Sequence, residues 1–196
     1  MAKFSGKTIA IANQKGGVGK TTTTVNLAAY LAVTEVPVLL IDMDPQSNAT
    51  TGVGVETGSY QNSVYDVLIG KKSIKKCILE TELDYLKVLP SSPQLVGAEI
   101  ELVNMFSREA MLRNAIKEIE YDYEYILIDS PPSLGLLTVN VLSAANSILI
   151  PIQCEYYALE GLSQLLNTIR LVQKHLNKEL DIEGILITMY DNRLNL

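Results

Sequence analysis

The sequence predicts an α/β protein whose mostly parallel β-sheet is covered by helices on both faces. Six short apolar runs alternate with segments of helical periodicity, which is typical of parallel strands joined by right-handed crossovers. Apolar residues make up 47% of the chain and aromatic residues only 6%, a mixture that suits buried Val, Ile and Leu strands. In such sheets ligands bind at the carboxyl edge, so the strand ends are the places to search for function.

The elements can be assigned from periodicity and from turn residues. We expect strands over residues 8–12, 36–41, 86–90, 125–128, 147–153 and 184–189. We expect helices after the first glycine loop to about residue 35, over 64–69 behind a capping box at Ser63, over 134–146 and over 159–176, with one or two packing helices between 99 and 119. Residues 47–54 are polar and contain glycine, which predicts a mobile loop.

Length and composition bound the class of protein. The 196 residues fit a single domain over 1–196, with Cys77 and Cys154 too far apart to indicate a zinc site or a disulfide framework. We expect a reducing, cytoplasmic location, because no signal peptide and no run of about 18 apolar residues is seen. The net charge of −6 argues against a surface devoted wholly to nucleic acid.

One glycine-rich stretch lies between the first strand and the first helix. It consists of Gln14, Lys15, Gly16, Gly17, Val18, Gly19, Lys20, Thr21 and Thr22. Closely spaced glycines let successive backbone N–H groups point into one concavity, and the helix N-terminus adds attraction for anions. Lys20 is placed to reach the β- and γ-phosphates of a nucleotide, and Thr21 to ligate the magnesium ion that bridges them. The stretch therefore predicts a P-loop site for a nucleoside triphosphate.

The loop departs from the usual pattern at its start. Gln14 stands where the first glycine is normally found, and Lys15 adds a second lysine. One lysine suffices for the phosphate contact, so Lys15 either serves the nucleotide of a neighbouring subunit or is a solvated loop residue. A glycine-rich turn without ligand is the simpler alternative for the whole stretch.

Carboxylates follow two of the predicted strands. Asp42 and Asp44 come after the second strand, and Asp129 ends the strand that begins near Tyr125. An acid at such a strand end is typical of the group that holds magnesium through a bound water, which we expect of Asp129. His175 has no partner in sequence and is expected at the surface.

In combination these motifs resemble the ParA/Soj partition ATPases. The resemblance rests on residues 15–22, 42–50, 129–133 and 155–161, and it covers essentially the whole chain. Lys15 is the signature lysine of the deviant Walker A class. The resemblance implies that Lys15 reaches the partner subunit's phosphates, that Asp44 positions the attacking water, and that Thr188, Met189, Tyr190 and Asp191 lie near the purine.

The resemblance also implies a biological role. It implies a cytoplasmic, nucleoid-associated ATPase that forms an ATP-dependent homodimer, binds DNA non-specifically and is stimulated by a ParB-type partner to segregate a chromosome or plasmid. Family members usually run further, so we expect this chain to lack the C-terminal part of the fold and to bind DNA weakly, with no stable membrane association.

Three alternatives remain at this point. A MinD-like membrane-cycling ATPase shares the loop but resembles the chain less at Asp44. An iron-protein reductase requires cysteines in a pattern that Cys77 and Cys154 do not follow. A non-catalytic nucleotide-binding module would hold ATP without turnover.

Overall fold

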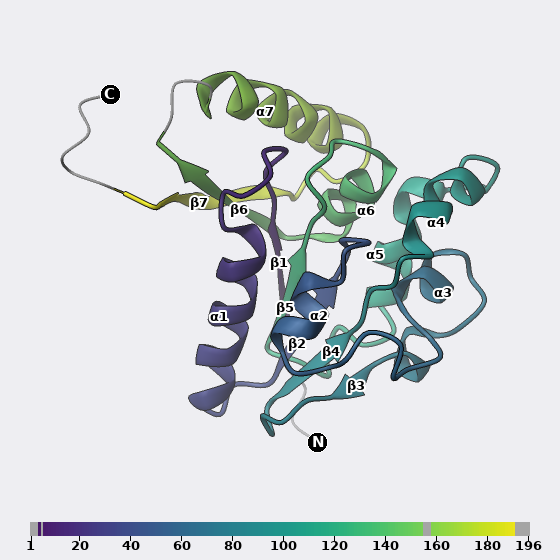
Figure 1. Cartoon of the computed structure of the whole chain (residues 1–196). Helices are drawn as coiled ribbons and strands as arrows, with labels where there is room; N and C mark the ends of the chain where they lie inside the picture. The colour runs from purple at the N-terminus through teal and green to yellow at the C-terminus, as the bar shows by residue number, and fades with distance from the viewer. Residues whose placement is uncertain (1–3, 5, 155–157, 191–196) are drawn as a thin grey trace.

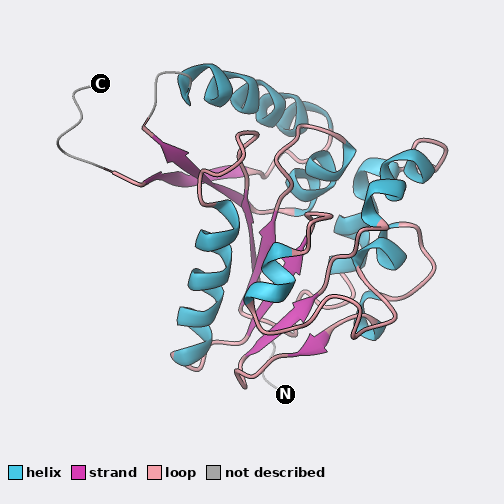
Figure 2. Ribbon diagram, in the orientation of Figure 1, coloured by secondary structure: helices cyan, strands magenta, loops and turns pink. Residues whose placement is uncertain are grey.

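The fold is a single seven-stranded sheet between helices, seen in a computed structural model that describes residues 4, 6–154 and 158–190 (Figures 1 and 2). The strands are β1 (Lys7–Ile11), β2 (Val38–Asp42), β3 (Leu79–Glu80), β4 (Leu86–Leu89), β5 (Tyr125–Asp129), β6 (Ser147–Gln153) and β7 (Asp181–Thr188). Their order is β3-β4-β2-β5-β1-β6-β7, and every neighbouring pair is parallel except β3 with β4. The predicted α/β class is confirmed, but the expected count of six strands missed the two-residue β3.

Helices cover both faces of this sheet. They are α1 (Lys20–Val33), α2 (Asn48–Gly52), α3 (Val64–Leu68), α4 (Leu95–Leu102), α5 (Met111–Ile116), α6 (Leu136–Ala144) and α7 (Ala158–His175), with short 3₁₀ turns η1 (Ile74–Lys76) and η2 (Arg108–Ala110). Alternate strand residues divide between two apolar clusters. Ile9 and Ile11 pack with α1 and α2, whereas Ala10 packs with the side of the sheet that α3 to α7 cover.

The strand register brings the predicted site to one edge. In β5, Asp129 pairs with Ile11 at the end of β1 and with Asp42 at the end of β2. Because all three strands are parallel, their carboxyl ends meet beside the glycine loop that leaves β1. The capping box at Ser63 is present as predicted: its side chain accepts a hydrogen bond from Tyr65 N, and the Asp66 side chain accepts one from Ser63 N at 3.0 Å.

Residues 47–54 differ from the mobile loop that the sequence predicted. The segment contains the helix α2, and Thr50 within it is fully buried. Its sequence, Asn-Ala-Thr-Thr-Gly, has little helical propensity. The helix is held instead by tertiary bonds from Thr50 to the carboxylate of Asp42.

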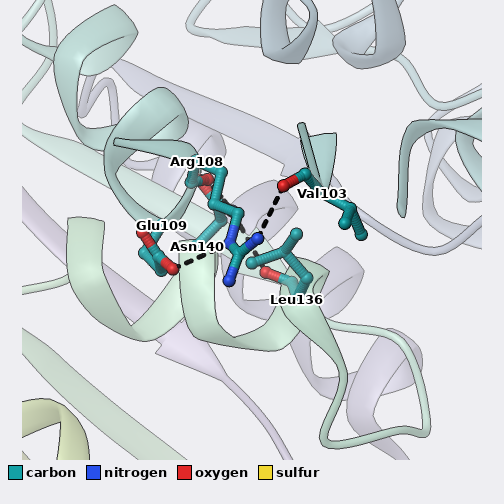
Figure 3. A network of polar contacts seen from close by, with 5 residues as sticks. All are labelled: Val103, Arg108, Glu109, Leu136 and Asn140. Carbon is teal, nitrogen blue, oxygen red and sulfur yellow. Dashed lines mark hydrogen bonds and ion pairs between the residues drawn. The ribbon is translucent and has the colours of Figure 1, made fainter. Parts of the chain in front are cut away.

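The packing helices between residues 99 and 119 also differ in part. Two helices form, α4 and α5, and Val103 and Phe106 between them are exposed, Phe106 at 97% of its surface. Figure 3 shows the polar contacts in this segment: the guanidinium of Arg108 donates to the carbonyl of Val103 at 2.6 Å, and Asn140 donates to the carbonyl of Arg108 at 2.8 Å. Ser107 has a φ of 55°, which interrupts the helical path between α4 and α5, so Val103 and Phe106 do not continue the buried face of one helix.

The remaining expectations concern the surface. His175 is exposed at the end of α7, as predicted. Among the residues that the structure describes, no helix has the length and apolar character needed to cross a membrane.

Candidate nucleotide site

The glycine loop has the backbone of an anion cradle. Gly17 and Gly19 have φ angles of 74° and 87°, a left-handed conformation that favours glycine. The first intrahelical bond of α1 runs from Thr23 N to Gly19 O at 2.8 Å, so the N–H groups of the three preceding helical residues have no acceptor within the helix. A Cβ added at Gly16 or Gly17 would meet nothing within 4 Å. The start of α1 therefore has N–H donors without an acceptor in the helix, and the loop before it has open space beside Gly16 and Gly17.

Lys20 lies at the first turn of α1, almost fully buried at 6% exposure. Its Nζ donates to the carbonyl oxygen of Lys15 at 3.0 Å, so the side chain folds back over its own loop. Burial lowers the pKa of Lys20, and the nearby carboxylates of Asp129 and Asp44 oppose that shift. The two carboxylates thus favour the charged form of Lys20. That cation offsets the repulsion that the carboxylates would exert on a phosphate.

Asp129 is completely buried at the end of β5 and accepts hydrogen bonds on both oxygens. Thr21 Oγ1 donates to its Oδ2 at 2.7 Å, and Thr24 Oγ1 lies 3.1 Å from its Oδ1. Burial raises the pKa of Asp129 to about 7, against the hydrogen bonds from the two threonines, which lower it.

The same oxygen atoms fit a magnesium ion. Hydroxyl and carboxylate oxygens are its preferred ligands, and proteins usually hold it with one or two side chains plus phosphate oxygens and water. The described part of the chain contains no cluster of three His, Cys, Asp or Glu side chains that would bind a metal ion by itself. Thr21 and Asp129 thus suit an ion that arrives with a nucleotide.

Asp42 and Asp44 take different positions at the end of β2. Asp42 is fully buried, and its two oxygens accept from Asp44 N at 3.0 Å and from Thr50 N and Oγ1 at 2.8 and 2.7 Å. Burial raises the pKa of Asp42 to about 6, opposed by those hydrogen bonds. Asp44 retains 8% exposure, and its Oδ1 accepts from Gln46 N at 2.9 Å. Of the two carboxylates, Asp42 is therefore the more deeply buried and the one with more hydrogen bonds.

Both backbone polar groups of Lys15 are hydrogen-bonded. Its N–H donates to Asn13 Oδ1 at 3.0 Å, while Asn13 Nδ2 donates to the carbonyl of Pro151 in β6 at 2.7 Å. The carbonyl of Lys15 accepts from Lys20. The loop is thereby fixed to β6 through Asn13 and to α1 through Lys20.

The end of β7 packs against the loop from the other side. Thr188 Oγ1 donates to the carbonyl of Val18 at 2.9 Å, and a Cβ on Gly19 would lie 3.5 Å from Thr188 Cγ2. The Val18 side chain is buried, so Val18 contributes its backbone to the surface of the loop. Met189 follows with 62% exposure, whereas Asp191 lies outside the described residues, as do 155–157 of the motif 155–161.

The structure thus brings Lys20, Thr21, Asp44 and Asp129 together, with Lys15 and the glycines around them. Thr22 is exposed on the first turn of α1, where its carbonyl accepts from Asn26 Nδ2 at 2.8 Å. Sequence reasoning missed three polar residues that support the site, Asn13, Thr24 and Thr50, and it did not foresee the contact of Thr188 with the loop. The run Thr21–Thr24 gave a signal, because its first and last members share a helix face at a spacing of three.

The sheet order and the glycine loop define a P-loop protein of the nucleoside triphosphate-binding class. A family profile described as an AAA domain matches residues 6–182. The chain is 59% identical over 191 residues to the sporulation initiation inhibitor protein Soj of Bacillus subtilis, which covers 97% of this chain and 76% of that protein. It is 56% identical to the chromosome partitioning protein ParA of Myxococcus xanthus, covering 97% of this chain and 68% of the relative. The chain belongs to the ParA/Soj family of partition ATPases.

Solved structures agree with this fold. A cobyrinic acid a,c-diamide synthase from Mycobacterium smegmatis, with bound ATP analogue and magnesium, matches with a TM-score of 0.91 and 39% identity over 96% of this chain and 77% of that one. A plasmid partition protein from Borrelia burgdorferi matches with a TM-score of 0.82 and 30% identity over 96% of this chain and 81% of that one.

Proposed function

We propose that the chain is a magnesium-dependent ATPase that alternates between a monomer and an ATP-bound dimer in DNA partition. The observation that carries this proposal is the convergence of Lys20, Thr21, Asp129 and Asp44 at one sheet edge, where the first N–H groups of α1 have no acceptor within the helix. Two features of relatives support it further: the Myxococcus xanthus relative is a chromosome partitioning protein, and the Mycobacterium smegmatis structure holds an ATP analogue with magnesium.

The nucleotide phosphates would bind to the first turn of α1 and to the loop before it. The N–H groups of Gly16 to Thr22 cradle the phosphates, and Lys20 moves from the carbonyl of Lys15 onto the β- and γ-phosphate oxygens. Magnesium, held by Thr21 and through water by Asp129, would neutralise charge on the same oxygens. We expect adenine to be preferred over guanine, with Met189 and Asp191 near the purine.

Hydrolysis requires a water aimed at the γ-phosphate. Asp44 is the least buried of the three carboxylates on this edge, with 8% of its surface exposed, whereas Asp42 and Asp129 have none. Asp44 would accept a hydrogen bond from the attacking water and orient it, a contribution that matters in the transition state and little in the ground state.

Lys15 is assigned to the second subunit's nucleotide. Lys20 already supplies the cation of its own site, and the loop beyond Lys15 is open at Gly16 and Gly17, where a second loop can approach. A charge supplied in trans to transferring phosphates is worth about 10³–10⁵ in rate in related chemistry. We propose two partners for the dimer: DNA, bound non-specifically and weakly by this chain, and a ParB-type protein. The proposed location is the cytoplasm, in association with the nucleoid.

The direct test is ATP binding and hydrolysis by the chain and by Lys20→Ala. We expect the variant to lose measurable binding of Mg·ATP in calorimetry, because the phosphate oxygens lose their main cation. Lys117→Ala, which removes an exposed lysine at the end of α5, is the matched control and should bind as the unaltered chain does. Normal ATP binding and turnover in Lys20→Ala would contradict the proposal.

A further inference from the structure

One buried carboxylate connects α2 to the backbone of Asp44. The two oxygens of Asp42 have separate tasks: Oδ1 accepts from Asp44 N at 3.0 Å, and Oδ2 accepts from Thr50 N at 2.8 Å and Thr50 Oγ1 at 2.7 Å. Hydrogen bonds to an ionised acceptor in a dry interior are among the stronger ones in proteins. The position of residue 44 is therefore tied to the position of residue 50.

A third segment fixes the direction of the Thr50 hydroxyl. The N–H of Ser91, two residues after β4, donates to Thr50 Oγ1 at 3.1 Å. Because that bond uses Thr50 Oγ1 as an acceptor, the hydroxyl proton is left to point at Asp42. Thr50 itself has no exposed surface. The three groups form what we call the Asp42 network: Asp42, Thr50 and the N–H of Ser91.

The turn that carries Asp44 is strained. Ser47 has a φ of 56°, although it is not a glycine and is buried. Such a conformation is unfavourable for a residue other than glycine and persists only where the surroundings hold it. Within the turn, Ser47 N donates to the carbonyl of Asp44 at 2.9 Å and Gln46 N donates to the Asp44 carboxylate at 2.9 Å. The direction of that carboxylate thus depends on a turn whose first residue, Asp44, is hydrogen-bonded through its N–H to Asp42.

We propose that Thr50 is a positioning residue for ATP hydrolysis, acting through Asp42 to fix the direction in which the Asp44 carboxylate points. This inference rests on the proposed role of Asp44 in orienting the attacking water. Thr50 touches neither nucleotide nor water. It sets the geometry of the residue that does, and a misplacement of about 1 Å at such a group costs on the order of 10²-fold in rate.

The test compares Thr50→Val, Thr50→Ser and Thr51→Val in single-turnover hydrolysis and in Mg·ATP titrations. Thr50→Val removes both bonds made by the hydroxyl, and we expect a loss in the hydrolysis rate of roughly 10-fold or more with ATP affinity within about 2-fold. Thr50→Ser keeps the hydroxyl and should restore the rate. Thr51 lies on the same helix, but its hydroxyl bonds only to the carbonyls of Ser47 and Asn48, so Thr51→Val should leave the rate unchanged.

Asp44→Ala in the same assay separates the two claims. If Asp44→Ala hydrolyses ATP normally, the proposed role of Asp44 is wrong and the positioning role falls with it. If Asp44→Ala is slow while Thr50→Val keeps the full rate, or loses rate and affinity in equal measure, the inference about Thr50 alone is overturned. Should Thr50→Val lack a cooperative unfolding transition, Thr50→Ala removes the same hydroxyl and is subject to the same criteria.

Discussion

The hydroxyl of Thr21 donates a hydrogen bond of 2.7 Å to the carboxylate of Asp129, 108 residues further along the chain. Thr24, one turn later on α1, bonds to the other oxygen of the same carboxylate. The helix that follows the glycine loop is therefore joined to the end of β5 through a buried acid. This contact aligns the loop with the strand edge, and it places a carboxylate where a magnesium ion is expected with the nucleotide.

Burying Asp129 makes the stability of the ligand-free protein depend on pH. The folded-state pKa is raised to about 7 from 3.8, so the native state binds more protons than the unfolded state between these values, and the free energy of unfolding falls as pH rises across them. At 1.36 kcal/mol per pKa unit, this group alone removes about 2–3 kcal/mol between pH 5 and pH 7. Asp42, with a pKa of about 6, acts in the same direction.

Asp129→Asn should remove most of that slope. We expect urea unfolding in EDTA to show the variant gaining stability relative to the unaltered chain as pH is raised from 5 to 8. Asp84→Asn, which neutralises an exposed carboxylate, is the control and should leave the slope unchanged. A constant difference between Asp129→Asn and the unaltered chain over this range would show that Asp129 is ionised throughout.

Asp44→Ala is expected to separate binding from hydrolysis. Removing a group that orients water should slow single-turnover hydrolysis by about 10²-fold or more, with ATP affinity nearly unchanged. Asp44→Asn keeps an oxygen that can accept from Gln46 N and should also be slow, which distinguishes loss of the charge from loss of the turn. An affinity loss as severe as that of Lys20→Ala would identify Asp44 as a binding group instead.

Gly16→Ala probes the approach of a second loop. A Cβ at Gly16 meets no atom within 4 Å in the chain itself, and Gly16 does not have a positive φ, so the unfolding free energy should change by less than about 0.5 kcal/mol. In an ATP-bound dimer the added methyl group should crowd the opposing loop and reduce the dimer fraction. Gly19→Ala, at a φ of 87°, should instead destabilise the monomer by about 1–3 kcal/mol. Full dimerisation of Gly16→Ala would mean that the loops do not face each other.

Much of the site could be predicted from sequence, because its motifs occupy the ends of strongly apolar strands. Lys20, Thr21 and Asp129 follow directly from the strand, loop and helix order. The Asp42 network could not be predicted, because α2 has poor intrinsic propensity and forms only through bonds to residues outside it. The two-residue β3 was missed for a similar reason, since it forms only by pairing with β4.

The central claim is an ATP-dependent dimer completed by Lys15, and sedimentation velocity tests it most directly. The chain should sediment as a monomer with Mg·ADP and as a dimer with Mg²⁺ and a non-hydrolysable ATP analogue. Lys15→Ala should still bind the analogue but remain a monomer, because each site would lack the cation supplied by its partner. An equal dimer fraction in the two proteins with the analogue would contradict the assignment of Lys15 to the partner's phosphates, and a chain that stays monomeric with the analogue would contradict the switch itself.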